Sequence, residues 1–171
     1  LEQQDRRANP LIYENETDNF NQPHYELHNE IKLGSNLTMH STLYHIHGNG
    51  YYEQYKDGRR FSEYNIPPEH VVNPLGDTID VITSGDLVQQ QWVNKNQWGW
   101  NPSLEFAHDR GTLQLGGSFY YFNSEHWGQV VWAEGISNKI GPRHRYYEYY
   151  GKKYLASLFV AQDYQLTDRL N

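Results

Sequence analysis

The sequence has no cysteine in its 171 residues, and it has no long apolar run. Without cysteine, disulfide frameworks, thiolate metal sites and thiol nucleophiles are all excluded. Small secreted eukaryotic domains often carry disulfides, so a bacterial or cytosolic setting is favoured. The longest charge-free apolar stretch, 154–161, is far shorter than the ~18 residues that indicate a membrane helix. The opening residues also lack the apolar segment of a signal peptide. We therefore expect no membrane-spanning helix.

Clusters of basic residues and the common catalytic motifs are missing too. The chain has 21 acidic and 14 basic residues, a formal net charge of -7, which argues against a nucleic-acid partner. The sequence has no His-Glu-x-x-His pair, Gly-x-Ser-x-Gly elbow or phosphate-binding glycine loop. Asp77 and Asp80 form a carboxylate pair, but solvated loop charges are common in such a proline-flanked stretch. The sequence predicts a protein that is not an enzyme and uses no cofactor, with a small hydrolase as the weakest alternative.

Aromatic residues and period-2 alternation are abundant. The 15 Tyr, 6 Phe and 5 Trp make up 15% of the chain, whereas disordered segments are poor in aromatics. Apolar residues recur at every second position in blocks, which is the pattern of strands with one apolar face. The alternation predicts five strands, at about 20–33, 37–53, 87–107, 113–127 and 152–166. Short turns join the first strand to the second and the third to the fourth. Long polar connections, at 54–86 and 128–150, join the others.

The two short turns determine the register of two predicted hairpins. A turn at 34–36 pairs apolar with apolar and polar with polar residues: Leu27 with Leu43, Ile31 with Met39, Glu30 with His40 and His28 with Thr42. A turn at 108–111 aligns one apolar stripe: Phe106 with Leu113, Leu104 with Leu115, Pro102 with Gly117, Trp100 with Phe119 and Trp98 with Tyr121. Each hairpin is therefore predicted to have one apolar and one polar face.

The apolar stripe of the second hairpin has the dimensions of a membrane-spanning sheet. It is aromatic at both ends, and the steps from Trp98 to Phe106 span roughly 21 Å at ~3.4 Å per residue and ~40° tilt. Transmembrane barrels have an apolar band about 25 Å tall between aromatic girdles, with short turns at one rim and long loops at the other. Five strands cannot close a barrel, because bacterial barrels have about eight or more and open edges are prohibitive in hydrocarbon.

These features predict an all-β fold: an antiparallel up-and-down meander that forms five strands of a larger transmembrane β-barrel. The alternative is a soluble β-sandwich that acts as a binding module, for example for carbohydrate, because the strands of a sandwich also alternate. The asymmetry between short turns and long loops favours the barrel.

Four segments resemble the TonB-dependent outer-membrane receptors of Bacteroidetes: 18–27 (DNFNQPHYEL), 48–56 (GNGYYEQYK), 86–92 (DLVQQQW) and 125–132 (EHWGQVVW). The tail 164–171 (YQLTDRLN) resembles a periplasmic turn of the same barrels. The matches follow the family's order over essentially the whole chain. The resemblance implies that residues 1–171 are a partial receptor barrel domain, which starts inside an extracellular loop and lacks the plug, the TonB box and the closing strand.

The same resemblance implies a function for the parent protein. Receptors of this family are barrels of about 22 strands with a plug, and they import scarce nutrients such as metal chelates, cobalamin or glycans. The expected location is the bacterial cell outer membrane. The expected partners are outer-membrane lipid, the TonB complex through the missing N-terminal part, the nutrient ligand and, as a further candidate, a surface lipoprotein.

Nine histidines raise the question of a metal site. His24, Glu26 and His28 share one strand face, and His45 and His47 have the spacing of adjacent ligands on a strand. The predicted register places these two groups on opposite faces of the hairpin. We therefore expect no metal site, and we predict polar residues that line the interior of a barrel instead.

Ligand contact is predicted in the extracellular loops, where tyrosine and tryptophan are dense. Such rings serve as anchors at the membrane interface or as stacking platforms for a sugar or a chelate ring, and the pattern favours the anchor role. The candidates are Tyr51, Tyr52, Tyr55, Trp127, Trp132, Tyr146 and Tyr147.

Overall fold

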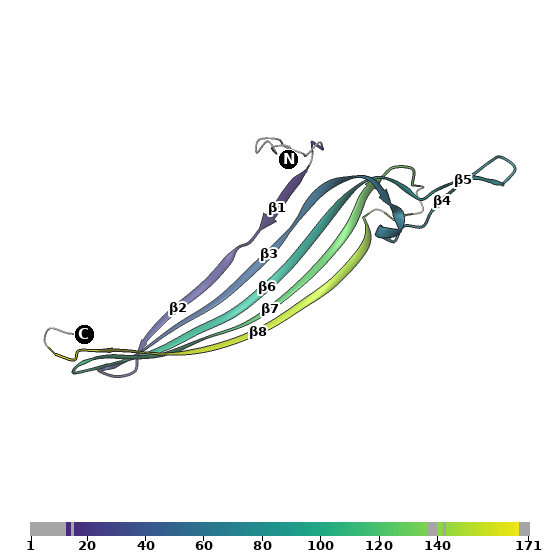
Figure 1. Ribbon diagram of the computed structural model, residues 1–171. Helices are drawn as coiled ribbons and strands as arrows, with labels where there is room; N and C mark the ends of the chain where they lie inside the picture. The colour runs from purple at the N-terminus through teal and green to yellow at the C-terminus, as the bar shows by residue number, and fades with distance from the viewer. Residues whose placement is uncertain (1–12, 15, 137–139, 142, 168–171) are drawn as a thin grey trace, which may run out of the picture. The chain divides into compact units, whose positions relative to one another are not determined.

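A computed structural model describes residues 13–14, 16–136, 140–141 and 143–167 of the chain. In these residues the regular elements are β-strands and a single 3-10 turn. The elements are β1 (Thr17–Asn21), β2 (His24–Lys32), β3 (Leu37–Arg60), η1 (Phe61–Tyr64), β4 (Glu69–Val72), β5 (Thr78–Ile82), β6 (Ser84–His108), β7 (Gly111–Ala133) and β8 (His144–Tyr164). One sheet has the order β1-β3-β6-β7-β8, with β2 also paired to β3, and β4 pairs with β5 in a second sheet (Figure 1). The predicted all-β, antiparallel, up-and-down architecture is confirmed.

The predicted register of the first hairpin is confirmed residue by residue. β2 pairs antiparallel with β3, and Leu27 lies opposite Leu43. In the second hairpin only residues 109–110 separate β6 from β7. There Trp100 stacks on its predicted partner Phe119, with ring centroids 5.9 Å apart. Apolar side chains therefore meet across both hairpins, as the alternation predicts.

The strands differ from the predicted ones mainly at one end. Instead of a loop at 54–86, β3 continues to Arg60, η1 and the β4–β5 hairpin follow, and β6 begins at Ser84. Instead of a loop at 128–150, β7 continues to Ala133 and β8 begins at His144. These extensions were not predicted because polar and aromatic side chains occupy both faces there. Hydrogen bonds between strand backbones form without any alternation of side chains.

The first predicted strand, 20–33, is interrupted. Residues 22–23 separate β1 from β2, and both strands pair with β3. Pro23 has no N–H to donate to the ladder, so regular pairing stops there. The Pro23 carbonyl still accepts a hydrogen bond from the His47 N–H at 3.1 Å, which keeps the chain beside β3.

The residues divide into two compact units, and β1, β3, β6, β7 and β8 contribute to both. Unit 1 takes the described residues of 1–20, 49–93 and 126–149. Unit 2 takes the described residues of 21–48, 94–125 and 150–171.

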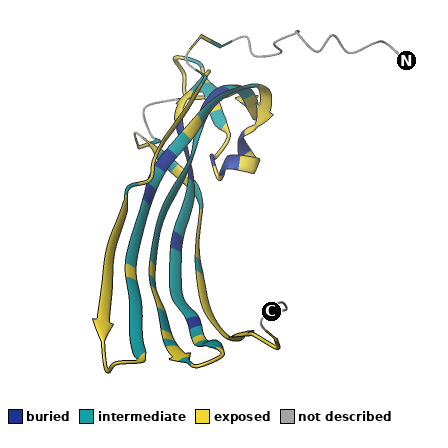
Figure 2. Ribbon diagram, turned by 90° about the vertical axis from the view of Figure 1, so that its left-hand side faces the viewer, coloured by how far each residue is buried: buried dark blue, intermediate teal, exposed yellow. Residues whose placement is uncertain are grey.

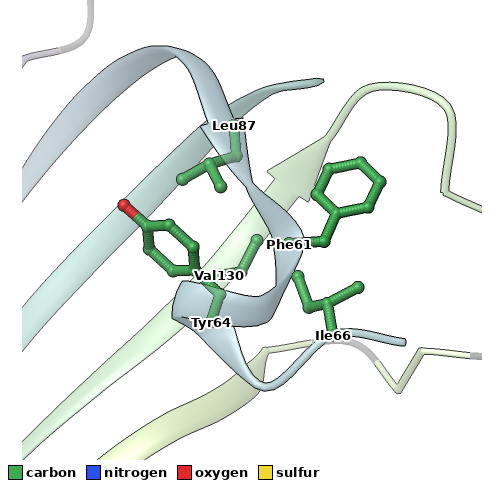
Figure 3. Packing of buried hydrophobic residues seen from close by; sticks show 5 residues of the cluster. All are labelled: Phe61, Tyr64, Ile66, Leu87 and Val130. Carbon is green, nitrogen blue, oxygen red and sulfur yellow. The ribbon is translucent and has the colours of Figure 1, made fainter. Parts of the chain in front are cut away.

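Unit 1 has a small hydrophobic core, which η1 closes. The buried side chains come from the turn, from the residue two positions after it, and from two strands: Phe61, Tyr64, Ile66, Leu87 and Val130 (Figure 3). Phe61 is 1% exposed, and full burial of such a side chain contributes about 1.5–3 kcal/mol. The turn ends at Asn65, whose φ of 53° is a left-handed conformation that asparagine tolerates. Together these contacts fix η1 on one face of the unit 1 strands.

Unit 2 carries an exposed apolar band, defined as the large apolar side chains that the structure leaves open on its strands. On the face that carries Leu104 and Leu158 they are Tyr25, Leu27, Ile31, Leu43, Trp98, Trp100, Leu104, Phe106, Leu115, Tyr150, Tyr154, Leu158, Val160 and Tyr164. None of the buried hydrophobic residues described in the structure belongs to unit 2. The strands β2 and β8 are exposed along almost their whole length (Figure 2). Unit 2 is therefore a single layer whose apolar side chains no second layer covers within the described residues.

The other face of unit 2 carries most of its polar side chains, and Leu155 and Phe159 of β8 are also exposed on it. His28 contacts Glu26 at 3.0 Å and the Thr42 hydroxyl at 3.0 Å. The Ser118 hydroxyl donates to the Asn101 side-chain oxygen at 2.8 Å. Opposite faces of the same strands thus differ in chemistry, as predicted.

Two glycines of β7 leave room for large side chains to pack against the backbone of that strand. A Cβ at Gly117 would lie 3.0 Å from Leu158 Cδ2 and 3.1 Å from Phe119 Cε2. A Cβ at the adjacent Gly116 would lie 2.5 Å from the Phe159 ring. Close packing within the strand therefore explains this glycine pair.

Candidate functional site

All seven residues predicted to contact a ligand lie on strands, so the prediction that they lie in loops is wrong. Three are on β3, two on β7 and two on β8, in this order: Tyr51, Tyr52 and Tyr55; Trp127 and Trp132; Tyr146 and Tyr147. All seven belong to unit 1. Their side chains do not form one cluster, and the successive residues Tyr51 and Tyr52 belong to different groups of rings.

One group forms a tryptophan ladder, defined here as Tyr51, Trp92, Trp127 and Arg145. Tyr51 and Trp92 have ring centroids 4.4 Å apart, and Trp92 stacks on Trp127 at 5.4 Å and 6°. The Arg145 guanidinium lies 4.6 Å from the Trp127 ring centroid, and it donates to Glu148 at 2.5 Å. The ladder crosses β3, β6, β7 and β8, and its mutual contacts stabilise the four strands.

A second group forms the tyrosine face, defined as Tyr52, Tyr64, Tyr146, Tyr147 and Tyr149. Tyr64 and Tyr146 have ring centroids 4.7 Å apart, Tyr146 and Tyr147 are 4.9 Å apart, and Tyr147 and Tyr149 are 6.0 Å apart. His126 adds a ring that is parallel to Tyr149 within 6° at 4.7 Å. The tyrosine face thus joins residues of β3, η1 and β8 that are distant in the sequence.

Amide groups hold the tyrosine face in place. The Tyr146 hydroxyl donates to Gln89 Oε1 at 3.0 Å, and Gln89 in turn donates to Gln54 at 3.4 Å. The Tyr52 hydroxyl donates to Gln91 Oε1. Asn65, at the end of η1, donates to the Tyr146 main-chain carbonyl at 2.7 Å. Because Gln89 is buried, these hydrogen bonds also satisfy polar atoms that would otherwise destabilise the unit.

Burial raises the pKa of the hydroxyls on the tyrosine face. Desolvation is the largest cause for Tyr52, Tyr146 and Tyr147, and neighbouring tyrosines add to it. Since the neutral form of each phenol is favoured, these hydroxyls stay protonated at neutral pH. They can therefore both donate and accept hydrogen bonds.

Tyr55 and Trp132 lie apart from both groups. The Tyr55 hydroxyl donates to Asp86, which raises the pKa of Tyr55 to about 12 and lowers that of Asp86. Asp86 also accepts from the Gly58 N–H at 2.9 Å. Trp132 is an exposed ring on β7. Tyr55 is thus committed to a structural hydrogen bond.

The histidines are engaged in pairs rather than gathered at one point. His45 Nε2 and His47 Nδ1 both lie within hydrogen-bond distance of Asn96 Oδ1, at 3.1 and 3.0 Å. His45 also stacks on Trp98 with ring centroids 3.7 Å apart. Within the described part of the chain, no group of three or more His, Asp or Glu side chains could hold a metal ion.

Sequence reasoning missed Tyr64 of the tyrosine face and the two glutamines that hold it, Gln89 and Gln91. Tyr64 contacts the other rings because η1 packs onto the strands. Gln89 and Gln91 lie in a run of three glutamines, where polar residues occupy both faces and no apolar stripe marks the strand. Tyr149 lies in the tyrosine-rich part of the segment predicted as a ligand-contacting loop, beside Tyr146 and Tyr147. The only available signal was the density of tyrosine at 146–150.

Comparison with protein-family models, curated proteins and solved structures finds no match to this chain. Among the described residues, no helix is both long enough and apolar enough to cross a membrane.

Proposed function

We propose that this chain forms part of the barrel of a TonB-dependent receptor in a bacterial outer membrane, and that the parent protein binds and imports a scarce nutrient. The observation that carries the proposal is the exposed apolar band of unit 2. A soluble protein rarely leaves so large an apolar patch open to water. A β-sandwich would cover the band with a second sheet, and within the described residues no such sheet is present.

The order of side chains along the band supports contact with lipid. On β6 it begins with Trp98, which is 56% exposed, and on β8 it begins with Tyr150 and Tyr154. Aliphatic residues such as Leu104 and Leu158 follow, and Tyr164 lies near the other end of β8. Aromatic girdles around an aliphatic centre are typical of transmembrane barrels.

The strands are longer than a bilayer crossing requires. β3, β6, β7 and β8 have 24, 25, 23 and 21 residues, about twice the ~9–11 residues that a tilted strand needs to cross a bilayer. The length in excess of a bilayer crossing is available for ligand contact. The open backbone groups along β2 and β8 require further strands in the parent protein, because each unpaired group costs several kcal/mol in lipid.

Cell fractionation and uptake together test this proposal. The protein that contains this chain should be recovered in the outer-membrane fraction, and it should stay there after alkaline carbonate and urea washes. Uptake of its nutrient should stop when the TonB complex is deleted. Recovery in the soluble fraction would contradict the membrane assignment. Membrane retention with uptake that does not depend on TonB would contradict the receptor assignment.

A further inference from the structure

The tyrosine face presents aromatic surface to solvent. Tyr149 is 55% exposed, and it lies between His126 and Tyr147 in a row of nearly parallel rings. An aromatic ring with a polar tip is suited to a ligand that has both apolar C–H surfaces and hydroxyl groups. A row of such rings can contact successive units of one extended ligand.

The rings are fixed before any ligand arrives. Tyr146 and Tyr147 are consecutive residues, yet both approach the same glycine, Gly128, closely enough that an added Cβ would overlap them. The hydroxyl of Tyr146 is held by Gln89, and its main chain is held by Asn65. A pre-organised surface loses little conformational entropy when it binds, which favours affinity.

The charged groups beside these rings are paired with opposite charges. Arg145 and Glu148, which flank Tyr146 and Tyr147 in the sequence, form an ion pair at 2.5 Å. At Tyr64, Arg59 and Glu63 act on the phenol with opposite signs. An anionic metal chelate would be expected to require an unbalanced cation here, because recognition of anions relies on charge-assisted hydrogen bonds.

We propose that the tyrosine face binds a neutral carbohydrate, with sugar rings stacked on Tyr147 and Tyr149 and sugar hydroxyls hydrogen-bonded to the tyrosine hydroxyls and to the amides beside them. This assignment rests on the proposed function, since it names the class of nutrient that the receptor would take. It selects a glycan over a metal chelate or cobalamin.

Binding measurements on the purified full-length protein in detergent test the assignment. The probes are a panel of neutral hexasaccharides built from glucose, mannose or xylose, with ferric citrate and cyanocobalamin as comparators. At least one hexasaccharide should bind. Tyr149→Ala should weaken that binding about tenfold, since a stacked ring contact is lost, whereas Tyr149→Phe should change it less than about threefold.

Two further variants test whether the loss of binding is specific to the tyrosine face. Trp132→Ala removes another exposed ring of unit 1 and should leave binding unchanged. Gly128→Ala displaces Tyr146 and Tyr147 and should weaken it. Because Tyr149 is exposed, its substitution should leave the thermal melting of the protein unchanged.

The outcomes separate this inference from the proposed function. Binding of ferric citrate or cyanocobalamin and of no hexasaccharide would overturn the assignment to carbohydrate. Hexasaccharide binding that Tyr149→Ala leaves unchanged would overturn its location. A protein that binds hexasaccharide at Tyr149 but is found in the soluble fraction would support the inference and contradict the membrane receptor.

Discussion

Replacing Leu158 with arginine separates lipid contact from water contact at one position. Leu158 lies on β8, about midway between Tyr154 and Tyr164, and 80% of it is exposed. In water, a substitution at so exposed a site changes stability by about 0.5 kcal/mol or less. At the midplane of a bilayer, arginine on the lipid face of a barrel costs ~2–4 kcal/mol.

The difference between these two values is large enough to measure. At ~1.4 kcal/mol per factor of ten, a cost of ~2–4 kcal/mol reduces the folding equilibrium constant by roughly 30-fold to 1000-fold. The loss of packing adds little to this cost. Leu158 covers Gly117, and the aliphatic stem of arginine can cover the same surface.

The assay is reversible folding of the parent protein into phosphatidylcholine vesicles along a urea gradient, followed by heat-modifiable gel mobility. Ser157→Arg is the matched control, because Ser157 precedes Leu158 and points to the opposite face of β8. Leu158→Arg should shift the urea midpoint strongly, and Ser157→Arg should shift it slightly. A Leu158→Arg protein as stable as the unmodified one, or equal damage from both variants, would refute the assigned facing.

Three further substitutions test other parts of the structure. Phe61→Ala should lower the stability of unit 1 by about 3–5 kcal/mol, because it empties the centre of the core, and faster amide exchange around η1 would report it. Asp86→Asn should return the pKa of Tyr55 from about 12 toward its ordinary value of 10.0, as measured by ultraviolet absorbance titration. Because the folded pKa of Asp86 is depressed, its stabilising effect is present above the ordinary carboxyl pKa and is lost as pH falls through the folded value. Gly99→Val should destabilise unit 2 by about 1–3 kcal/mol in urea unfolding, because the new side chain would overlap the Tyr44 ring.

The sequence predicted the hairpins of unit 2 well because two independent constraints agreed there. Alternation determined which residues share a face, and short turns determined the register, so that Leu27 could be placed opposite Leu43 from the residues alone. In unit 1 neither constraint was available at the strand ends, because the side chains do not alternate regularly and no short turn determines the register. Residues 89–91 are all glutamine, so both faces of the strand are polar there and alternation gives no signal. The place of Gln89 and Gln91 in the sheet depends on pairing with distant strands.

The candidate site was only partly predictable for related reasons. The density of tyrosine drew attention to Tyr52, Tyr146 and Tyr147, and the structure brings these three together. It also separates them from Tyr51 and Trp127, which lie in the tryptophan ladder. Regular alternation would place Tyr146 and Tyr147 on opposite faces, so their joint approach to Gly128 required knowledge of the local strand geometry.

The most direct test of lipid contact uses the absence of cysteine from this chain. A single environment-sensitive fluorophore is attached to Leu104→Cys or to Ser103→Cys in the parent protein, folded in vesicles. Spin-labelled lipids should quench the label at position 104, and aqueous iodide should quench the label at position 103. If iodide quenches both labels and the spin-labelled lipids quench neither, the apolar band of unit 2 does not face a membrane.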